Sequence, residues 1–228
     1  MQKSRKTSQA KLSTTTRGRG RPRAFDREAA LGEATRVFWL KGYGATSVSD
    51  LTEVMGIGAT SLYAAFGSKE ALYAEALRHY NDSYQKLYWT RFFAAATARE
   101  AVASYLMDSS AALTGSLCDI PRGCMVALSS VGSEGHSDLG ELVRSSRAET
   151  LHRLRTRLDQ AVADGEIPAS VDVQALARFL QTVQNGMSIQ ARDGASRAEL
   201  ESVAQVAMLV WDARTSDRVA SAGQAARL

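Results

Sequence analysis

The segment from residue 45 to residue 72 restricts the fold most, because short apolar stripes at helical spacing lie on both sides of a Gly-Ile-Gly sequence. Leu51 and Val54 are expected on the inner face of one helix. Leu62 and Phe66, four positions apart, are expected on the inner face of the next. The pattern therefore predicts two short helices joined by a tight turn.

Capping residues flank these stripes. Side-chain oxygens that can accept from the first free N–H groups of a helix occur at Asp26, Ser47 and Ser68. Gly56 suits the left-handed position after a helix, and Gly58 stands where the next helix opens. Helices are thus expected from Asp26, Ser47, Gly58 and Ser68, the last running through Trp89.

The rest of the chain has the same helical periodicity and lacks the alternation typical of strands. Further helices are expected over residues 98–116, 123–132, 137–164, 172–192 and 197–213. No apolar run approaches the ~20 residues that a membrane span needs. Two cysteines in 228 residues fit a reducing compartment. We therefore expect an all-α, cytoplasmic protein that does not enter the membrane and is nucleoid-associated when bound to DNA.

The excess of basic over acidic side chains lies at the N-terminus. Residues 1–23 hold eight basic side chains and no acidic one, so the net charge of +4 leaves about −4 (+4 minus 8) for the remainder. Arg19-Gly20-Arg21-Pro22 resembles the core of an AT-hook, in which Arg19 and Arg21 would follow the floor of a narrow A/T minor groove. The alternatives are non-specific attraction to phosphates and an inert, solvated leader or tag.

In a helix-turn-helix, the outer face of the second helix meets base edges in the major groove. With Leu62 and Phe66 inside, the outer face carries Ala59, Thr60, Ser61, Tyr63 and Ala64. Ser47, Ser49 and Lys69 are expected at the phosphate backbone. Tyr63 and Lys69 have no evident packing role, which argues against a helical hairpin that binds nothing.

Residues 27–73 resemble the DNA-binding head of TetR-type transcriptional repressors. The matching residues are Thr46-Ser47, Gly56-Ile57, Leu62, Tyr63, Phe66 and Ser68-Lys69-Glu70-Ala71-Leu72, and residues 186–211 resemble the body of one subgroup. The resemblance implies an all-helical homodimer that binds double-stranded DNA at a palindromic operator and is released by a small-molecule effector, here unidentified. Ala59 and Ala64 depart from the family pattern, which often has a long polar residue and an aromatic or His there.

This resemblance also implies a division of the chain. We expect a disordered basic arm over residues 1–23 and a helix-turn-helix DNA-binding domain over residues 24–70. An effector-binding and dimerisation domain would span residues 71–215, followed by a frayed tail over residues 216–228.

The last two long helices carry apolar stripes that can pair with a second copy into a four-helix interface, or can serve as intrachain core. These stripes are Val173, Leu176, Leu180, Val183 and Met187, followed by Leu200, Val203, Val206 and Val210.

Polar residues on otherwise apolar helices are candidates for the effector pocket. They are Tyr105, Arg122, His152, Gln181, Gln184 and Asn185.

Cys118 and Cys124 are a candidate redox pair, or with Met125 and His136 a soft-metal site, or simply two small buried side chains. The chain has no HExxH, CxxC or P-loop pattern, so we expect no enzyme activity, no cofactor and no metal site. The competing functions are an architectural DNA-binding protein, a redox sensor, and a small-molecule-binding protein or enzyme with a vestigial head. Bound genomic fragments separate the repressor from the architectural protein: one palindrome favours a specific repressor, and broad A/T-rich recovery favours an architectural protein.

Overall fold

The computed structural model describes residues 25–216, and these form ten α-helices with no strand among them. The all-α prediction is therefore confirmed. Arg19, Arg21 and the rest of the predicted basic arm lie outside the described residues, as does the predicted frayed tail beyond Ser216. Within the described range, no helix is both long and apolar enough to cross a membrane.

Three helices form the head: α1 (Arg27–Ala45), α2 (Val48–Met55) and α3 (Ala59–Phe66). The predicted caps are present at each start. The Asp26 carboxylate accepts from the N–H groups of Glu28 and Ala29, and Ser47 forms a reciprocal capping box with Asp50. Gly56 ends α2 with φ +63°, a left-handed conformation that favours glycine, and Gly58 precedes α3 as predicted.

The fourth helix is divided where one long helix was expected. Its first part is α4 (Lys69–Tyr84), capped by Ser68, and a break at Gln85 separates it from the next helix. The remaining helices are α5 (Lys86–Ala94), α6 (Ala98–Leu113), α7 (Met125–Leu128), α8 (Ser137–Ala163), α9 (Val173–Arg192) and α10 (Arg197–Thr215). Helices α5–α10 form the body, and the predicted bounds of α6, α8, α9 and α10 agree to within three residues.

Two local predictions are wrong. Val54 does not point inward, since 42% of its surface is exposed, and Met55 takes the inner position beside Leu51. The helix expected over 123–132 shrinks to α7. The Arg147 guanidinium donates to the carbonyl oxygens of Val126, Ala127 and Ser129, which a longer helix would have used for its own backbone bonds.

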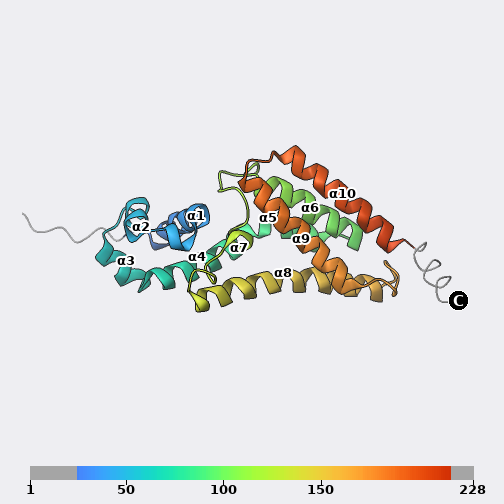
Figure 1. The fold of residues 1–228 in the computed structure, drawn as a ribbon, viewed down its shortest axis with the longest axis horizontal. Helices are drawn as coiled ribbons and strands as arrows, with labels where there is room; N and C mark the ends of the chain where they lie inside the picture. Colours follow the sequence, from blue (N-terminus) through green and yellow to red (C-terminus); the bar gives the residue numbers. More distant parts are fainter. Residues whose placement is uncertain (1–24, 217–228) are drawn as a thin grey trace, which may run out of the picture.

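The molecule is elongated, with the head at one end and the body at the other (Figure 1). Helix α4 packs along α1 and leads from the head into the body. In the body, α8 pairs with α9, and α6 packs against α5, α9 and α10. The apolar core is continuous from Leu51 and Leu62 in the head to Trp211 on α10.

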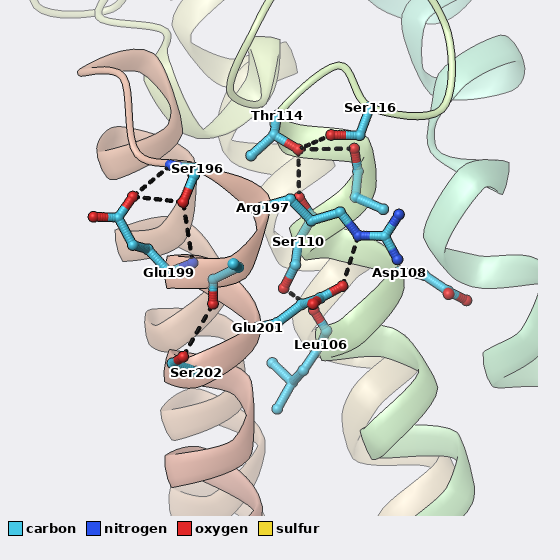
Figure 2. Close-up of polar contacts among 12 residues, drawn as sticks. Leu106, Asp108, Ser110, Thr114, Ser116, Ser196, Arg197, Glu199, Glu201 and Ser202 are labelled. Carbon is cyan, nitrogen blue, oxygen red and sulfur yellow. Dashed lines mark hydrogen bonds and ion pairs between the residues drawn. The ribbon is translucent and has the colours of Figure 1, made fainter.

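Helix α10 packs against helix α6, and polar side chains lie near the start of α10. Ser196 and Glu199 form a capping box at the start of α10. Figure 2 shows the Arg197 side chain between Glu201, to which it is ion-paired at 2.6 Å, and Asp108 on α6. Desolvation raises the pKa of the Asp108 carboxyl above its ordinary value, and the partner that opposes this most is Arg91, 2.8 Å away.

Candidate nucleic-acid interface

The outer face of α3 is exposed along its whole length. Leu62 and Phe66 are buried beneath it, whereas Tyr63 keeps 47% of its surface exposed. Ala59, Thr60, Ser61 and Ala64 are exposed as well. The face predicted to meet bases is therefore not covered by other parts of the described chain.

The Arg27 side chain of α1 holds the C-terminal end of α3 in place. The Arg27 guanidinium lies 4.3 Å from the centroid of the Phe66 ring and also donates to the carbonyl oxygen of Ala65 at 3.3 Å. The same guanidinium is ion-paired with Glu75 on α4 at 2.8 Å. Helix α3 is thus held by α1 and α4 together, so its outer face has a fixed orientation.

The start of α2 lies on the surface and is tightly organised. The Ser47 hydroxyl accepts from the N–H of Asp50 at 3.0 Å and donates to the Asp50 carboxylate at 2.8 Å. Lys41 is ion-paired with that carboxylate at 2.8 Å, and its hydrogen bond is the main reason why the pKa of Asp50 is well below the ordinary range. Ser47 and Ser49 are both exposed at this helix N-terminus, a position suited to a phosphate.

Lys69 has a packing role that the sequence did not indicate. Its Nζ lies 4.2 Å from the centroid of the Tyr43 ring, and the Tyr43 hydroxyl donates to Glu70 at 2.7 Å. Burial raises the pKa of Tyr43, and the Tyr43 hydrogen bond is the largest cause of the lowered pKa of Glu70. Lys69 is half-buried, so the stacking restricts where its charge can reach.

The residues that tie the head to the body carry no signal in the local sequence. The indole N–H of Trp39 on α1 donates to the carbonyl oxygen of Gly123 at 2.9 Å. Arg192, at the end of α9, donates to the carbonyl oxygens of Trp39 and Leu40 at 2.8 and 3.0 Å. These partners are more than 80 residues apart in the chain, and no local pattern indicates them.

Four of the six candidate effector residues come together. Tyr105, Gln181, Gln184 and Asn185 line a cavity between α6, α7, α8 and α9. His152 instead lies exposed on α8, because the apolar stripe of that helix passes through Leu154 and Leu158. Arg122 also lies apart from the cavity and donates to the carbonyl oxygen of Ala195. His152 and Arg122 therefore lie away from this cavity, and the effector role of all six residues stays a prediction.

Both cysteines are free thiols: Cys118 is exposed and Cys124 is buried. Cys124 accepts a hydrogen bond from the Tyr80 hydroxyl at 3.2 Å. His136 packs instead against the Tyr43 ring, with centroids 4.5 Å apart. Within residues 25–216, no group of three or more His, Cys, Asp or Glu side chains is placed to hold a metal ion.

The apolar stripes of α9 and α10 divide into two sets. Leu176, Leu180, Met187 and Leu200 are buried within the chain and belong to its own core. On α10, by contrast, Val206 and Leu209 expose 61% and 69% of their surface, with Val210 beside them. The stripe predicted as one interface is thus partly intrachain core and partly an exposed apolar face.

Two family models match the chain. Residues 30–76 match the model described as "Bacterial regulatory proteins, tetR family", and residues 97–207 match "Tetracyclin repressor-like, C-terminal domain". Among curated proteins, the chain is 38% identical over 198 residues to the HTH-type transcriptional repressor ComR of Escherichia coli (strain K12), covering 86% of this chain and 93% of ComR. It is 29% identical over 196 residues to the repressor BdcR of the same strain, covering 82% and 90%.

The chain is also similar to solved structures of TetR family regulators. A cysteine mutant of the TetR family regulator CifR, complexed with 26-base-pair double-strand operator DNA, is similar with a TM-score of 0.79 and 40% sequence identity. That alignment covers 84% of this chain and 100% of the CifR chain.

Proposed function

The chain belongs to the TetR family of DNA-binding transcriptional regulators, and we propose that it is a dimeric repressor that binds a palindromic operator and leaves it when a small molecule binds the body. The observation that carries the proposal is the exposed outer face of α3, held rigidly by Leu62, Phe66 and Arg27. Membership in a family of regulators also agrees with the expectation that the protein is not an enzyme.

On the head, residues have separate roles in this proposal. Thr60, Ser61 and Tyr63 donate to or accept from base edges, and the methyl groups of Ala59 and Ala64 meet thymine methyls. Ser47, Ser49 and Lys69 contact phosphates on either side and set the register of α3 in the groove. The DNA-binding domain spans residues 24–70, and residues 71–215 serve effector binding and dimerisation.

A second copy is the proposed occupant of the exposed face of α10. An apolar face of this kind is costly in water, and covering one Leu or Val side chain contributes about 1.5–3 kcal/mol. Val206, Leu209 and Val210 supply such side chains in a row, and Ile189 on α9 is exposed as well. A two-fold dimer would present two copies of α3 to two half-sites about one helical turn of DNA apart.

The role of α3 in DNA binding is tested by removing its exposed tyrosine ring. Tyr63→Ala is expected to weaken operator binding by about 1–3 kcal/mol, roughly 5- to 150-fold, with the thermal midpoint unchanged. Lys69→Ala is expected to lower the salt slope of binding by about one, the loss of one phosphate contact. Titration of fluorescent operator at several salt concentrations measures both quantities.

His152→Ala is the matched control for the Tyr63→Ala variant, because it removes an exposed ring from α8. It should leave operator affinity unchanged. Equal affinity in the Tyr63→Ala, His152→Ala and unaltered proteins would remove α3 from DNA recognition. Because Lys69 also stacks on Tyr43, the thermal midpoint of the Lys69→Ala protein must be recorded alongside the salt slope of its operator binding.

The N-terminal arm is proposed to add minor-groove recognition. Ala59 and Ala64 give α3 short outer side chains, so Arg19 and Arg21 would supply discrimination by entering narrow A/T grooves beside each half-site. Deletion through Arg23 should lower affinity and also erase a preference for A/T over G/C flanks. Competition between operators that differ only in their flanks, at one salt concentration, measures this. An equal loss on both flanks would reduce the arm to a source of charge.

A further inference from the structure

The cavity of the body is lined mainly by uncharged side chains, many of them polar, from several helices. Tyr88, Tyr105, Cys124, Arg147, Gln184 and Asn185 all contribute to its walls. The free space inside amounts to about 10 Å³ for the centre of a water-sized sphere, which is room for roughly one water molecule. Any larger molecule must therefore move a wall.

One group inside the cavity lacks a partner. Tyr105 is fully buried, and its hydroxyl makes no hydrogen bond to any of the described residues. Desolvation raises its pKa well above the ordinary value, so the hydroxyl remains neutral and able to donate. An unpaired buried hydroxyl is unfavourable in a folded protein, so an acceptor in the cavity, whether a water molecule or a ligand oxygen, is stabilised by accepting from it.

The one charged lining residue is already occupied. The Arg147 guanidinium donates to the carbonyl oxygens of Val126, Ala127 and Ser129 at 2.9, 3.1 and 2.7 Å. Those bonds hold the Nη2 end of the guanidinium against the backbone, and a cation would meet no carboxylate among the lining residues. Because burying an unpaired charge is costly, the cavity favours an uncharged molecule.

The wall beside Cys124 is the link to the head. In the tripeptide 122–124, the carbonyl oxygen of Arg122 accepts from Arg192, and that of Gly123 accepts from Trp39 on α1. The N–H of Cys124 donates to the Ser188 hydroxyl at 2.7 Å. Movement of this tripeptide therefore pulls directly on α1.

The tripeptide is closely packed at Gly123. A Cβ added to Gly123, whose φ is +79°, would lie 2.5 Å from a methyl group of Leu128 and 2.9 Å from the carbonyl oxygen of Ser188. Arg192, which holds the carbonyl oxygens of Trp39 and Leu40, connects the same tripeptide to the end of α1.

We propose that the cavity binds a small uncharged molecule with a hydrogen-bond-accepting oxygen, which accepts from Tyr105 and displaces the tripeptide 122–124, shifting α1 and the head through Trp39 and Arg192. The inference rests on the proposed repressor function and identifies its effector class and its route of release. A ligand of this kind lowers operator affinity by its preference for the displaced state.

The test uses a covalent probe in the cavity of the full chain carrying Cys118→Ser. The Cys124 thiolate attacks the sulfenyl sulfur of methyl methanethiosulfonate, which forms a Cys124–S–S–CH3 disulfide and releases methanesulfinate. The added S–CH3 group exceeds the free space. Operator affinity should fall at least tenfold on modification and return when dithiothreitol reduces the disulfide. Intact mass spectrometry confirms one adduct.

A coupling control separates displacement of the tripeptide from general damage. Trp39→Phe removes the hydrogen bond to Gly123, and the ratio of affinities before and after modification should shrink in this variant. Full modification with unchanged operator affinity would overturn the inference, and so would a Cys124 that the probe reaches only in denaturant. Affinity before modification tests the repressor function separately, so the two failures are distinguishable.

The ligand class is tested by protection of Cys124. Butanone, an uncharged acceptor, should slow modification of the Cys118→Ser chain, and propanoate at equal concentration should not. Tyr105→Phe should reduce the protection by butanone, since the donor is gone while the ring is kept. Protection by propanoate alone, or equal protection with and without the Tyr105 hydroxyl, would contradict the proposed chemistry.

Discussion

Leu209→Glu is expected to give a monomer that no longer binds the operator at concentrations where the unaltered protein saturates it. In the single chain, 69% of Leu209 is exposed, so a carboxylate there is solvated and the fold should survive. In the proposed dimer the same carboxylate would be buried without a partner, at a cost of several kcal/mol. One head alone holds one half-site and loses the second set of contacts.

Sedimentation equilibrium gives the oligomeric state of this variant, and circular dichroism shows whether its helices are retained. Leu142→Glu is the matched control, because Leu142 is an exposed leucine on α8. The control should remain dimeric and bind the operator. A folded, dimeric Leu209→Glu protein with full affinity would exclude the exposed face of α10 as the interface. Leu180 is unsuitable for this test, since its burial within the chain means that a charge there unfolds the body.

Leu62→Ala is expected to destabilise the head by about 2–5 kcal/mol, the usual range for a leucine truncated in a packed core. Leu62 is fully buried and lies directly beneath the outer face of α3. The head is small, so a loss of this size should unfold much of it while the body remains folded. Operator binding should disappear together with the lost helix.

Urea unfolding followed by circular dichroism measures this loss. Val54→Ala, which removes an exposed apolar side chain from the neighbouring helix, should change the free energy of unfolding by less than about 0.5 kcal/mol. Comparable destabilisation by the two variants would mean that Leu62 is not the centre of the head. An unaffected Leu62→Ala protein would contradict the packing of α3.

Local signals predicted the helices and their ends well. Ser47 and Asp50 lie three residues apart, and Gly56 marks a backbone conformation that few other residues adopt, so each signal is complete within one turn of the chain. The outer face of α3 follows from two buried positions and helical geometry alone. Val54 was misplaced because it and Met55 lie on either side of the Leu51 direction, and packing against α1 decides between them.

Contacts between distant segments account for the remaining errors. The shortened α7 depends on Arg147, about 20 residues away, and the stacking of Lys69 depends on Tyr43. Three of the predicted polar residues on α9 line one cavity, because one helical face carries them toward α6 and α8. The stripe of Leu154 and Leu158 places His152 on the solvent side of α8, whereas no local pattern shows that Trp39 and Arg192 join the head to the body.

Selection of genomic DNA fragments by the purified full chain tests the central claim most directly. The source genome is sheared, bound at physiological salt, recovered with the protein and sequenced. A repressor that reads DNA with two copies of α3 predicts one enriched palindrome, with half-sites about one helical turn apart, that Tyr63→Ala protein fails to enrich. Recovery of broad A/T-rich DNA without a palindrome, or the same enrichment by Tyr63→Ala protein, would contradict it.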